Sequence, residues 1–415
     1  MTNRSSAALA AWLLASIYYF YQYVVRSSPG VMMPQLSEAF GLSALGTASL
    51  VSLFYYAYSV SSLVAGTALD LMGPRAVVPL GALITGIGAF LFGTGNLPAA
   101  YAGRLLQGGG GVFALIGAAY IANRNFPPSR AATLLGAAQM FGMAGGSAGQ
   151  FLVGPIIAAG FAWTNFWMVL GLGGVLLAIA LMALLPKKTP VMRSEAGIKN
   201  YLAPLGVVFR NPQSILCGLI AGLLFIPTTV FDMTWGVRFL QQAHGLDYGT
   251  AVMKSAMVPL GWMAGCPLLG LLSDRLQRRK PVIVGGGFVL LACLAWILYG
   301  KPGVFPPYTL GLIAGLASGA AMIPYTVIKE ANPTHLAGTA IGVLNFLNLS
   351  VTALLGPVFG WILQTHSDRG LRGIEQYQLT FKPLLYGVAL ALVLTLALKE
   401  TGAAARLPAR ARKAA

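Results

Sequence analysis

Two stretches of this 415-residue sequence, far apart along the chain, share one spacing of residues. The first is Gly66-Thr-Ala-Leu-Asp70-Leu-Met-Gly-Pro-Arg75, and the second is Gly270-Leu-Leu-Ser-Asp274-Arg-Leu-Gln-Arg-Arg279. An offset of 204 positions aligns the leading glycines, the aspartates and the closing arginines. Gly154-Pro155 and Gly356-Pro357 align at an offset of 202. Matching segments at a near-constant offset predict a chain built from two similar halves.

The composition around these stretches is that of a membrane protein. Hydrophobic residues make up 57% of the chain and charged residues 9%, against roughly 25% charged residues in soluble domains. The mean hydropathy is +0.74. A soluble protein of this length could not bury so much apolar surface. The formal charge of +17 therefore bears on membrane topology, and we expect no nucleic-acid partner.

Twelve apolar runs are long enough to cross a bilayer as helices. They cover residues 7–36, 44–68, 76–95, 99–121, 131–158, 164–186, 214–241, 250–272, 281–300, 307–328, 337–364 and 381–399. Helices satisfy their own backbone hydrogen bonds in lipid. The predicted fold is therefore an all-α membrane protein of twelve transmembrane helices, in two six-helix bundles related by a pseudo-two-fold axis along the membrane normal. The expected parts are an N-terminal bundle (1–186), a linker (187–213), a C-terminal bundle (214–399) and a basic tail (400–415).

The distribution of basic residues predicts the orientation in the membrane. With both termini inside, 19 Lys and Arg residues fall in inside segments and 5 in outside segments. We therefore expect both termini in the cytoplasm and a location in the plasma membrane, which is the inner membrane of a Gram-negative cell. The basic tail Arg406–Lys413 fits an anionic inner leaflet. We expect a monomer whose other partner is the lipid bilayer.

The repeated loop resembles the signature loop of the major facilitator superfamily. Arg104-Leu-Leu-Gln107-Gly108 in the fourth span and Gly154-Pro155 in the fifth resemble that family as well. The resemblance covers all twelve spans. It implies a secondary transporter in which the two bundles rock around a central site.

Two segments resemble organic-anion branches of that family. The segment from Tyr23 to Leu36, which contains Arg26, is similar to the first span of organophosphate:phosphate antiporters, and sugar-acid and anion symporters carry an arginine near this point. The segment from Glu330 to Ala340 resembles the loop after span ten of glycerol-phosphate transporters. Other family residues are replaced: the second arginine, the lysine and the histidine of the antiporters fall near Pro227, Ser62 and Phe141. The proton-linked acids of the anion symporters fall near Val25 and Gly111. The expected substrate is therefore a singly charged carboxylate or a zwitterion rather than a phosphate.

A charged residue inside a span usually faces the bundle interior or a wet cavity. Tyr18, Gln22 and Arg26 are spaced i, i+4, i+8 and are predicted to form one polar stripe on the first helix. A guanidinium suits a carboxylate because its donors form a fork. Arg26 is thus the expected substrate contact, and the alternative is a snorkelling or structurally paired arginine.

Asp232 and Arg104 are the candidate coupling residues. Asp232 lies in span seven after Ile226-Pro227-Thr228-Thr229, a run that could break the helix, and it could pair with Arg26 across the cavity. The alternative for Asp232 is an interhelical hydrogen bond or a position at the outer end of the span. Arg104, followed by Gln107 and Gly108 to Gly111, is interpreted as a structural or proton-relay contact.

Three further residues are candidates for the substrate site. Tyr55 belongs to a group of tyrosines in spans one and two, and Asn345 and Asn348 are spaced i, i+3 in span eleven. The two asparagines either bind substrate or join helices. Lys254 is expected near the outer mouth of span eight, where it snorkels or attracts anions.

The charged residues of the repeated loops are predicted to act as a conformational latch. Asp70 with Arg75, and Asp274 with Arg279, lie at the inner surface, where ion pairs and helix ends can bridge the two halves. The alternative is a simple topological anchor.

No pattern indicates an enzyme. The three cysteines Cys217, Cys266 and Cys293 lie in apolar stretches without metal-ligand spacing, so neither a metal nor a cofactor is expected. The predicted function is a gradient-driven transporter for a small organic anion or amino-acid-like solute, with a coupled proton or other ion. A proton-coupled exporter of drugs or metabolites is the first alternative, and a transporter-like solute sensor is the second.

Overall fold

The computed structural model describes residues 2–185, 198–301, 303–306 and 308–402. Within these ranges the chain is helical, and twelve helical segments are long and apolar enough to span a membrane. The predicted all-α fold with twelve spans is confirmed. The basic tail Arg406–Lys413 and the first part of the predicted linker lie outside the described residues.

The N-terminal half contains the first six spans. Its helices are α1 (Thr2–Val31), α2 (Met33–Phe40), α3 (Ala44–Met72), α4 (Pro74–Gly93), α5 (Leu97–Gly111), α6 (Phe113–Asn125), α7 (Pro128–Phe151), α8 (Val153–Ala158) and α9 (Trp163–Leu184). The first apolar run is thus divided, because the chain turns at Met32 and continues as the short helix α2. The fourth and fifth spans are each formed by two helices, α5–α6 and α7–α8.

The C-terminal half contains the other six spans. Its helices are α11 (Pro212–Ile226), the π-helix η1 (Pro227–Gly236), α12 (Val237–His244), α13 (Tyr248–Ser255), α14 (Met257–Arg275), α15 (Lys280–Tyr299), α16 (Thr309–Ser318), η2 (Gly319–Met322), α17 (Ile323–Glu330), η3 (Thr334–Leu336), α18 (Ala337–Asp368) and α19 (Gly373–Ala397). Between the halves, α10 (Ile198–Arg210) is a helix inside the predicted linker, and its Phe209 packs against Phe346 of α18 with ring centroids 5.9 Å apart.

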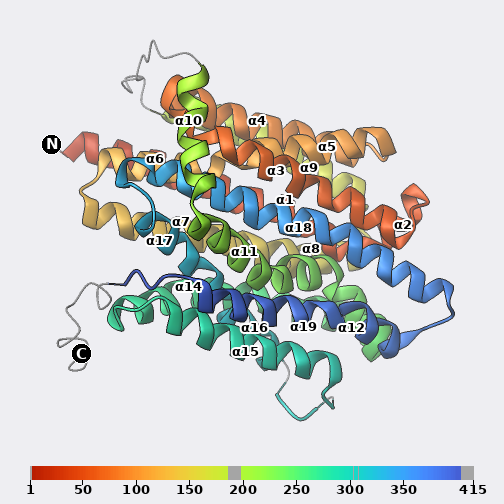
Figure 1. Ribbon diagram of the computed structural model, residues 1–415. Helices are drawn as coiled ribbons and strands as arrows, with labels where there is room; N and C mark the ends of the chain where they lie inside the picture. Colours follow the sequence, from red (N-terminus) through yellow and green to blue (C-terminus); the bar gives the residue numbers. More distant parts are fainter. Residues whose placement is uncertain (1, 186–197, 302, 307, 403–415) are drawn as a thin grey trace, which may run out of the picture.

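Figure 1 shows the long helices running side by side, with both chain termini at the same end. We call this the terminal end, and the opposite end the far end. Helix α10 crosses the bundle at the terminal end (Figure 1). Helices α3 and α18 pack together as the most extensive contact between the halves, and Ser59 Oγ of α3 donates a hydrogen bond to the carbonyl of Phe346 at 2.8 Å.

Polar residues define where several spans begin. The side chains of Ser43, Asn96, Asn211 and Asp247 each accept a hydrogen bond from a backbone N–H in the first turn of the following helix. This N-capping satisfies donors that have no partner within the helix. The residues at which these spans begin are therefore determined by the local sequence.

Span seven widens where the sequence predicted a break. Pro227 has no backbone N–H to donate, and residues Pro227–Gly236 form a π-helix rather than an unwound segment. Thr234 Oγ1 donates to the carbonyl of Thr229, five residues earlier, at 2.9 Å. The helix continues across the membrane, but its wider turn changes the direction of the side chains that follow. Such segments often occur at functional sites, and this one contains Asp232.

The far end of the bundle is sealed by contacts between the halves. A Cβ atom placed on Gly30 of α1 would lie 1.8 Å from the backbone oxygen of Met233 in η1, so only glycine permits this approach. The hydroxyl of Tyr248 on α13 donates to the carbonyl of Val31 at 2.6 Å. The structure therefore represents a conformation that is closed at the far end.

Candidate functional site

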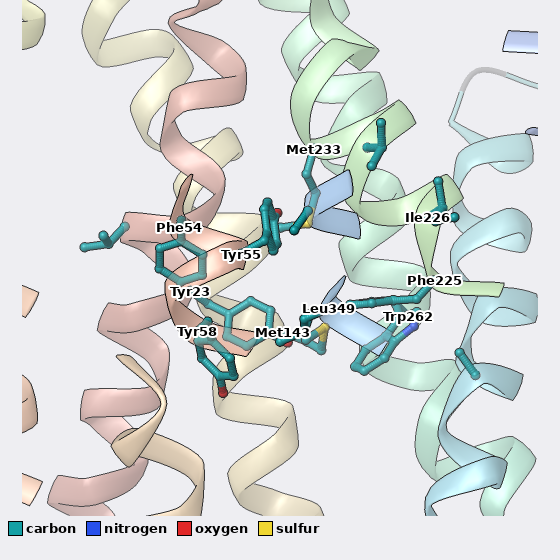
Figure 2. Packing of buried hydrophobic residues seen from close by; sticks show 14 of the residues in the cluster. Tyr23, Phe54, Tyr55, Tyr58, Met143, Phe225, Ile226, Met233, Trp262 and Leu349 are labelled. Carbon is teal, nitrogen blue, oxygen red and sulfur yellow. The ribbon is translucent and has the colours of Figure 1, made fainter. Parts of the chain in front are cut away.

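A small cavity of about 40 Å³ lies between the two halves. The N-terminal half contributes residues of α1, α3, α6 and α7, and the C-terminal half contributes residues of α11, α14, η2, α17 and α18. The lining residues are Tyr19, Tyr23, Arg26, Tyr58, Leu115, Gln139, Phe225, Trp262, Ala321, Met322, Tyr325, Asn345, Asn348 and Leu349. Figure 2 shows part of this boundary, with Tyr23, Tyr55 and Tyr58 on one side and Phe225, Trp262 and Leu349 on the other.

Arg26 lies in this cavity without a carboxylate partner. Its side chain is 4% exposed, and no ion pair to it occurs among the described residues. The carbon at the centre of the guanidinium lies 4.9 Å from the ring centroids of Tyr23 and Tyr55 and 5.4 Å from that of Phe225. Aromatic faces attract a cation, so the charge is held by rings from both halves.

The hydrogen-bond donors of Arg26 are only partly used. Nε donates to the Tyr55 hydroxyl at 3.4 Å, and Nη2 is buried with no partner. A buried guanidinium N–H without an acceptor is costly. The guanidinium therefore keeps a donor that could still bind an acceptor, and a carboxylate supplies two oxygens in matching geometry.

A second group of polar atoms lies on the C-terminal side of the cavity. The Tyr325 hydroxyl donates to Asn345 Oδ1 at 2.6 Å and accepts from Asn348 Nδ2 at 3.1 Å. Asn348 Oδ1 is buried without a partner. Both asparagines thus line the cavity and also join α17 to α18, and substrate binding by them stays a prediction. No pattern in the sequence indicated that Tyr325 belongs to this site.

The predicted polar stripe on α1 does not face the cavity along its whole length. Tyr18 is fully buried and donates to the carbonyl of Gly110 at 2.7 Å, and Gln22 packs against Gly111 within the N-terminal half. A step of four residues rotates a helix by about 40° beyond one turn, so Tyr18 and Arg26 differ in direction by about 80°. The expectation that Tyr18 and Gln22 lie beside Arg26 in the cavity is therefore wrong for this conformation, in which both residues pack within the N-terminal half. Tyr19, seven residues before Arg26, is in nearly the same direction and lines the cavity.

Tyr55 and Arg104 differ in their relation to the cavity. Tyr55 contacts the guanidinium of Arg26 directly. Arg104 is fully buried within the N-terminal half, where Nη1 donates to Gln107 Oε1 at 2.6 Å and to the carbonyl of Val25 at 3.3 Å, and Nη2 donates to the carbonyl of Val51 at 3.0 Å. These bonds join α1, α3 and α5, so Arg104 makes structural contacts in this conformation, and a role in proton relay stays a prediction.

Asp232 lies at the sealed far end and not beside Arg26. Its side chain is 5% exposed, and Oδ1 accepts a hydrogen bond from Ser255 Oγ at 3.0 Å. Gln150 Nε2, from the N-terminal half, donates to the same Ser255 hydroxyl at 3.3 Å. The expected pairing of Asp232 with Arg26 is absent from this conformation of the described chain. Instead the carboxyl group is part of a polar junction between the halves, and Oδ2 has no partner.

Arg279 is the centre of an ionic network at the terminal end. It pairs with Asp274 at 2.5 Å and with Glu330 at 2.8 Å, and its backbone N–H donates to Glu400 at 2.7 Å. Burial acts to lower the pKa of the Arg279 guanidinium, but the hydrogen bonds to Glu330 and Asp274 outweigh burial and raise that pKa. The network joins α14, α15, α17 and the chain after α19.

The position of this network differs from the expectation that the latch residues bridge the two halves. The ion pairs of Arg279 lie within the C-terminal half, and Arg75 donates to the carbonyl of Leu185 within the N-terminal half at 3.2 Å. The side chain of Asp70 is outside the described residues. Within the described part of the chain, neither arginine makes a contact that crosses between the halves, because the conformation is sealed at the far end instead. A latch that bridges the halves stays a prediction for the opposite conformation.

Two helical halves that enclose a buried cavity across a membrane define a membrane transporter rather than an enzyme. The comparisons with known proteins agree with this class, since residues 15–364 match the Major Facilitator Superfamily. The chain therefore belongs to that superfamily, and it is a secondary transporter.

Two relatives and one solved structure illustrate the similarity. The chain is 22% identical over 386 residues to the probable galactarate/D-glucarate transporter GudP of Bacillus subtilis, covering 82% of each protein. It is 25% identical over 376 residues to the probable sulfoacetate transporter SauU of Cupriavidus necator, covering 84% of this chain and 85% of that protein. A crystal structure of a mutant of the nucleoside transporter NupG matches with a TM-score of 0.74 at 14% identity, covering 94% of this chain and 99% of that one. The last comparison shows the shared fold.

Proposed function

We propose that this protein carries a small organic anion across the plasma membrane by alternating access, with Arg26 as the residue that binds the anionic group. The observation that carries the proposal is a buried guanidinium, in the cavity between the halves, that has an unpaired N–H donor and no carboxylate partner among the residues that the structure describes. A substrate carboxylate would supply the missing acceptor and neutralise the charge.

The remaining polar groups of the cavity favour a hydroxylated carboxylate such as a sugar acid. Asn345, Asn348 and Tyr325 offer donors and acceptors opposite Arg26, and Gln139 offers a further amide. The relatives named for galactarate, D-glucarate and sulfoacetate transport support an anionic substrate. A cavity of about 40 Å³ has room for a few water molecules but not for a sugar acid. Substrate binding must therefore accompany separation of the halves.

The proposed orientation of the chain in the membrane determines to which side this conformation is closed. The terminal end carries the excess of basic residues and is proposed to face the cytoplasm. The sealed far end then faces outward, so the structure represents the state that is closed to the outside. Substrate would reach the cavity from the outside only after the contacts of Gly30 and Tyr248 separate.

The test of this function is transport by purified protein in lipid vesicles. We expect vesicles preloaded with unlabelled D-glucarate, or with another sugar acid from a panel, to take up the radiolabelled compound in exchange, without ATP. Empty vesicles and a neutral sugar of the same size are the controls. Binding of a sugar acid without any exchange would contradict transport and favour a sensor, and exchange of neutral compounds alone would contradict an anion site.

We further propose that Asp232 is the residue at which a coupled proton is bound and released. An ionised carboxylate there would be buried without a counterion, which is costly, while a neutral side chain keeps the junction with Ser255 intact. Sealing the far end is therefore coupled to the charge of this group. An inward gradient of one pH unit stores about 1.4 kcal/mol per proton, enough for about tenfold accumulation of substrate.

The expected result for Asp232→Asn is loss of this accumulation, because the amide cannot bind or release the proton. Exchange of substrate at equal pH on both sides should continue. The matched control is Asp247→Asn, which changes an exposed aspartate at the start of α13 and should leave the accumulation unchanged. Tenfold accumulation by the Asp232→Asn variant would remove Asp232 from coupling, while exchange would still establish the transport function.

A further inference from the structure

A second cavity, of about 250 Å³, lies inside the C-terminal half. It is lined by η1, α12, α13, α14, α15 and α16 and by the segment after α15, and it shares no lining residue with the cavity around Arg26. We call it the C-half cavity. The proposed substrate site does not use it, so its chemistry is a separate question.

The lining of the C-half cavity extends from the far end, which we call its mouth, into the spans of the C-terminal half and forms a slot. At its mouth are the ends of helices, with His244 closing α12, Gly300 following α15 and Tyr308 preceding α16. Its depth reaches Leu290 on α15 and Ala314 on α16. The path from Leu290 to Gly300 is about 15 Å of helix rise. The slot therefore extends along the membrane normal, as a lipid chain does.

The walls of the slot are mainly apolar and aromatic. Phe231 and Phe239 pack against each other on one side with ring centroids 5.3 Å apart, and Leu294 and Ile297 face the slot from α15. At the mouth Trp296 packs edge-on against Phe305 at 5.1 Å. An apolar slot of this kind binds alkyl groups more readily than water.

The mouth carries positive charge. The charged groups are Lys254 and Lys301, and the imidazole of His244 lines the cavity beside them. Neither lysine forms an ion pair within the described part of the chain. The acidic lining residue is Asp232, which lies deeper and is hydrogen bonded to Ser255. The nearby Asp247 caps α13 and is not in the lining.

We propose that the C-half cavity binds a single-chain anionic amphiphile, of the fatty-acid class, from the outer leaflet of the bilayer. Its alkyl chain would fill the apolar slot, and its carboxylate would lie at the mouth between Lys254, Lys301 and His244. Basic side chains at helix ends near the headgroup level suit an anionic head. An amphiphile in a leaflet already has this orientation, so little ordering is needed for it to enter.

The proposal is tested by photo-crosslinking in nanodiscs of phosphatidylcholine, using a diazirine analogue of dodecanoate and peptide mass spectrometry. We expect saturable labelling of peptides from η1–α12 and from α15 through α16. Dodecanoate should compete with this labelling about tenfold better than dodecanol, because only the carboxylate pairs with the lysines. The binding assay involves no transport, so its outcome does not depend on the substrate of the Arg26 cavity.

The lysine variants identify the site of the carboxylate. Lys254→Gln combined with Lys301→Gln should remove the difference between acid and alcohol, while Lys382→Gln, at an exposed lysine of α19, should preserve it. Lys301 lies in an exposed segment. The single variant Lys301→Gln should therefore reduce the difference in competition between acid and alcohol even if the double variant does not fold. Unsaturable labelling spread over lipid-facing helices, or equal competition by acid and alcohol with the unmodified protein, would overturn the proposal.

Discussion

Replacing Arg26 with alanine is expected to reduce sugar-acid exchange by about 100-fold or more, because a buried charge pair with the substrate is lost. The side chain contacts Tyr23, Tyr55 and Phe225 and has no other ionic partner in the described chain. Arg26→Lys keeps the charge but loses the forked donors, so a smaller loss of about tenfold is expected. Exchange in vesicles with equal amounts of inserted protein is the measurement.

The control for this experiment is an arginine that lies away from the cavity. Arg372 is exposed at the start of α19, and Arg372→Ala should leave exchange unchanged. The melting temperature of each variant separates a lost contact from a lost fold. A folded Arg26→Ala protein with exchange equal to that of the unmodified protein would refute the role of Arg26 in substrate binding.

Replacing Gly30 with alanine is expected to stop the transport cycle while leaving the protein folded. The added Cβ atom would lie 1.8 Å from the backbone oxygen of Met233, and a backbone atom cannot move aside as a flexible side chain can. The halves therefore could not close at the far end, and exchange should fall by about tenfold or more, since a clash of this kind costs at least about 1–3 kcal/mol. Binding of the sugar acid from the outside should persist.

Thiol accessibility reports whether the far end is open. Val252 is buried behind the seal, so Val252→Cys, in a background without the native cysteines, should react slowly with a membrane-impermeant reagent. Adding Gly30→Ala should make this cysteine react faster. Gly285→Ala is the matched control, because a Cβ atom there meets nothing within 4 Å. An unchanged reaction rate together with normal exchange in the Gly30→Ala protein would show that this contact is not a gate.

Much of the fold follows from local properties of the chain. Apolar runs of sufficient length predict helices wherever they occur, because a backbone in lipid has few other ways to satisfy its hydrogen bonds. The caps at Ser43 and Asn96 act within the first helical turn. The glycines act between helices instead: a Cβ atom on Gly108 would lie 2.1 Å from the Phe54 carbonyl oxygen, so glycine allows α5 to pack closely against α3.

The candidate site was only partly visible in the sequence. Arg26 could be singled out because an arginine in an apolar span is rare and costly. The tyrosines that surround it are common in spans, and a helical stripe drifts by about 40° for every four residues. Spacing along one helix therefore placed Tyr18 and Gln22 beside Arg26, whereas the structure places Tyr19 and Tyr23 there.

Length, hydropathy and the repeated loops of this sequence were enough to determine twelve helices in two similar halves, since each of these signals acts through neighbouring residues. Only the tertiary structure decided which side chains meet. Asp232 lies with Ser255 and Gln150 rather than with Arg26, and Arg279 pairs with Glu330 inside one half. Such contacts depend on how helices distant in sequence rotate and tilt against each other, and that arrangement is set by packing over the whole bundle.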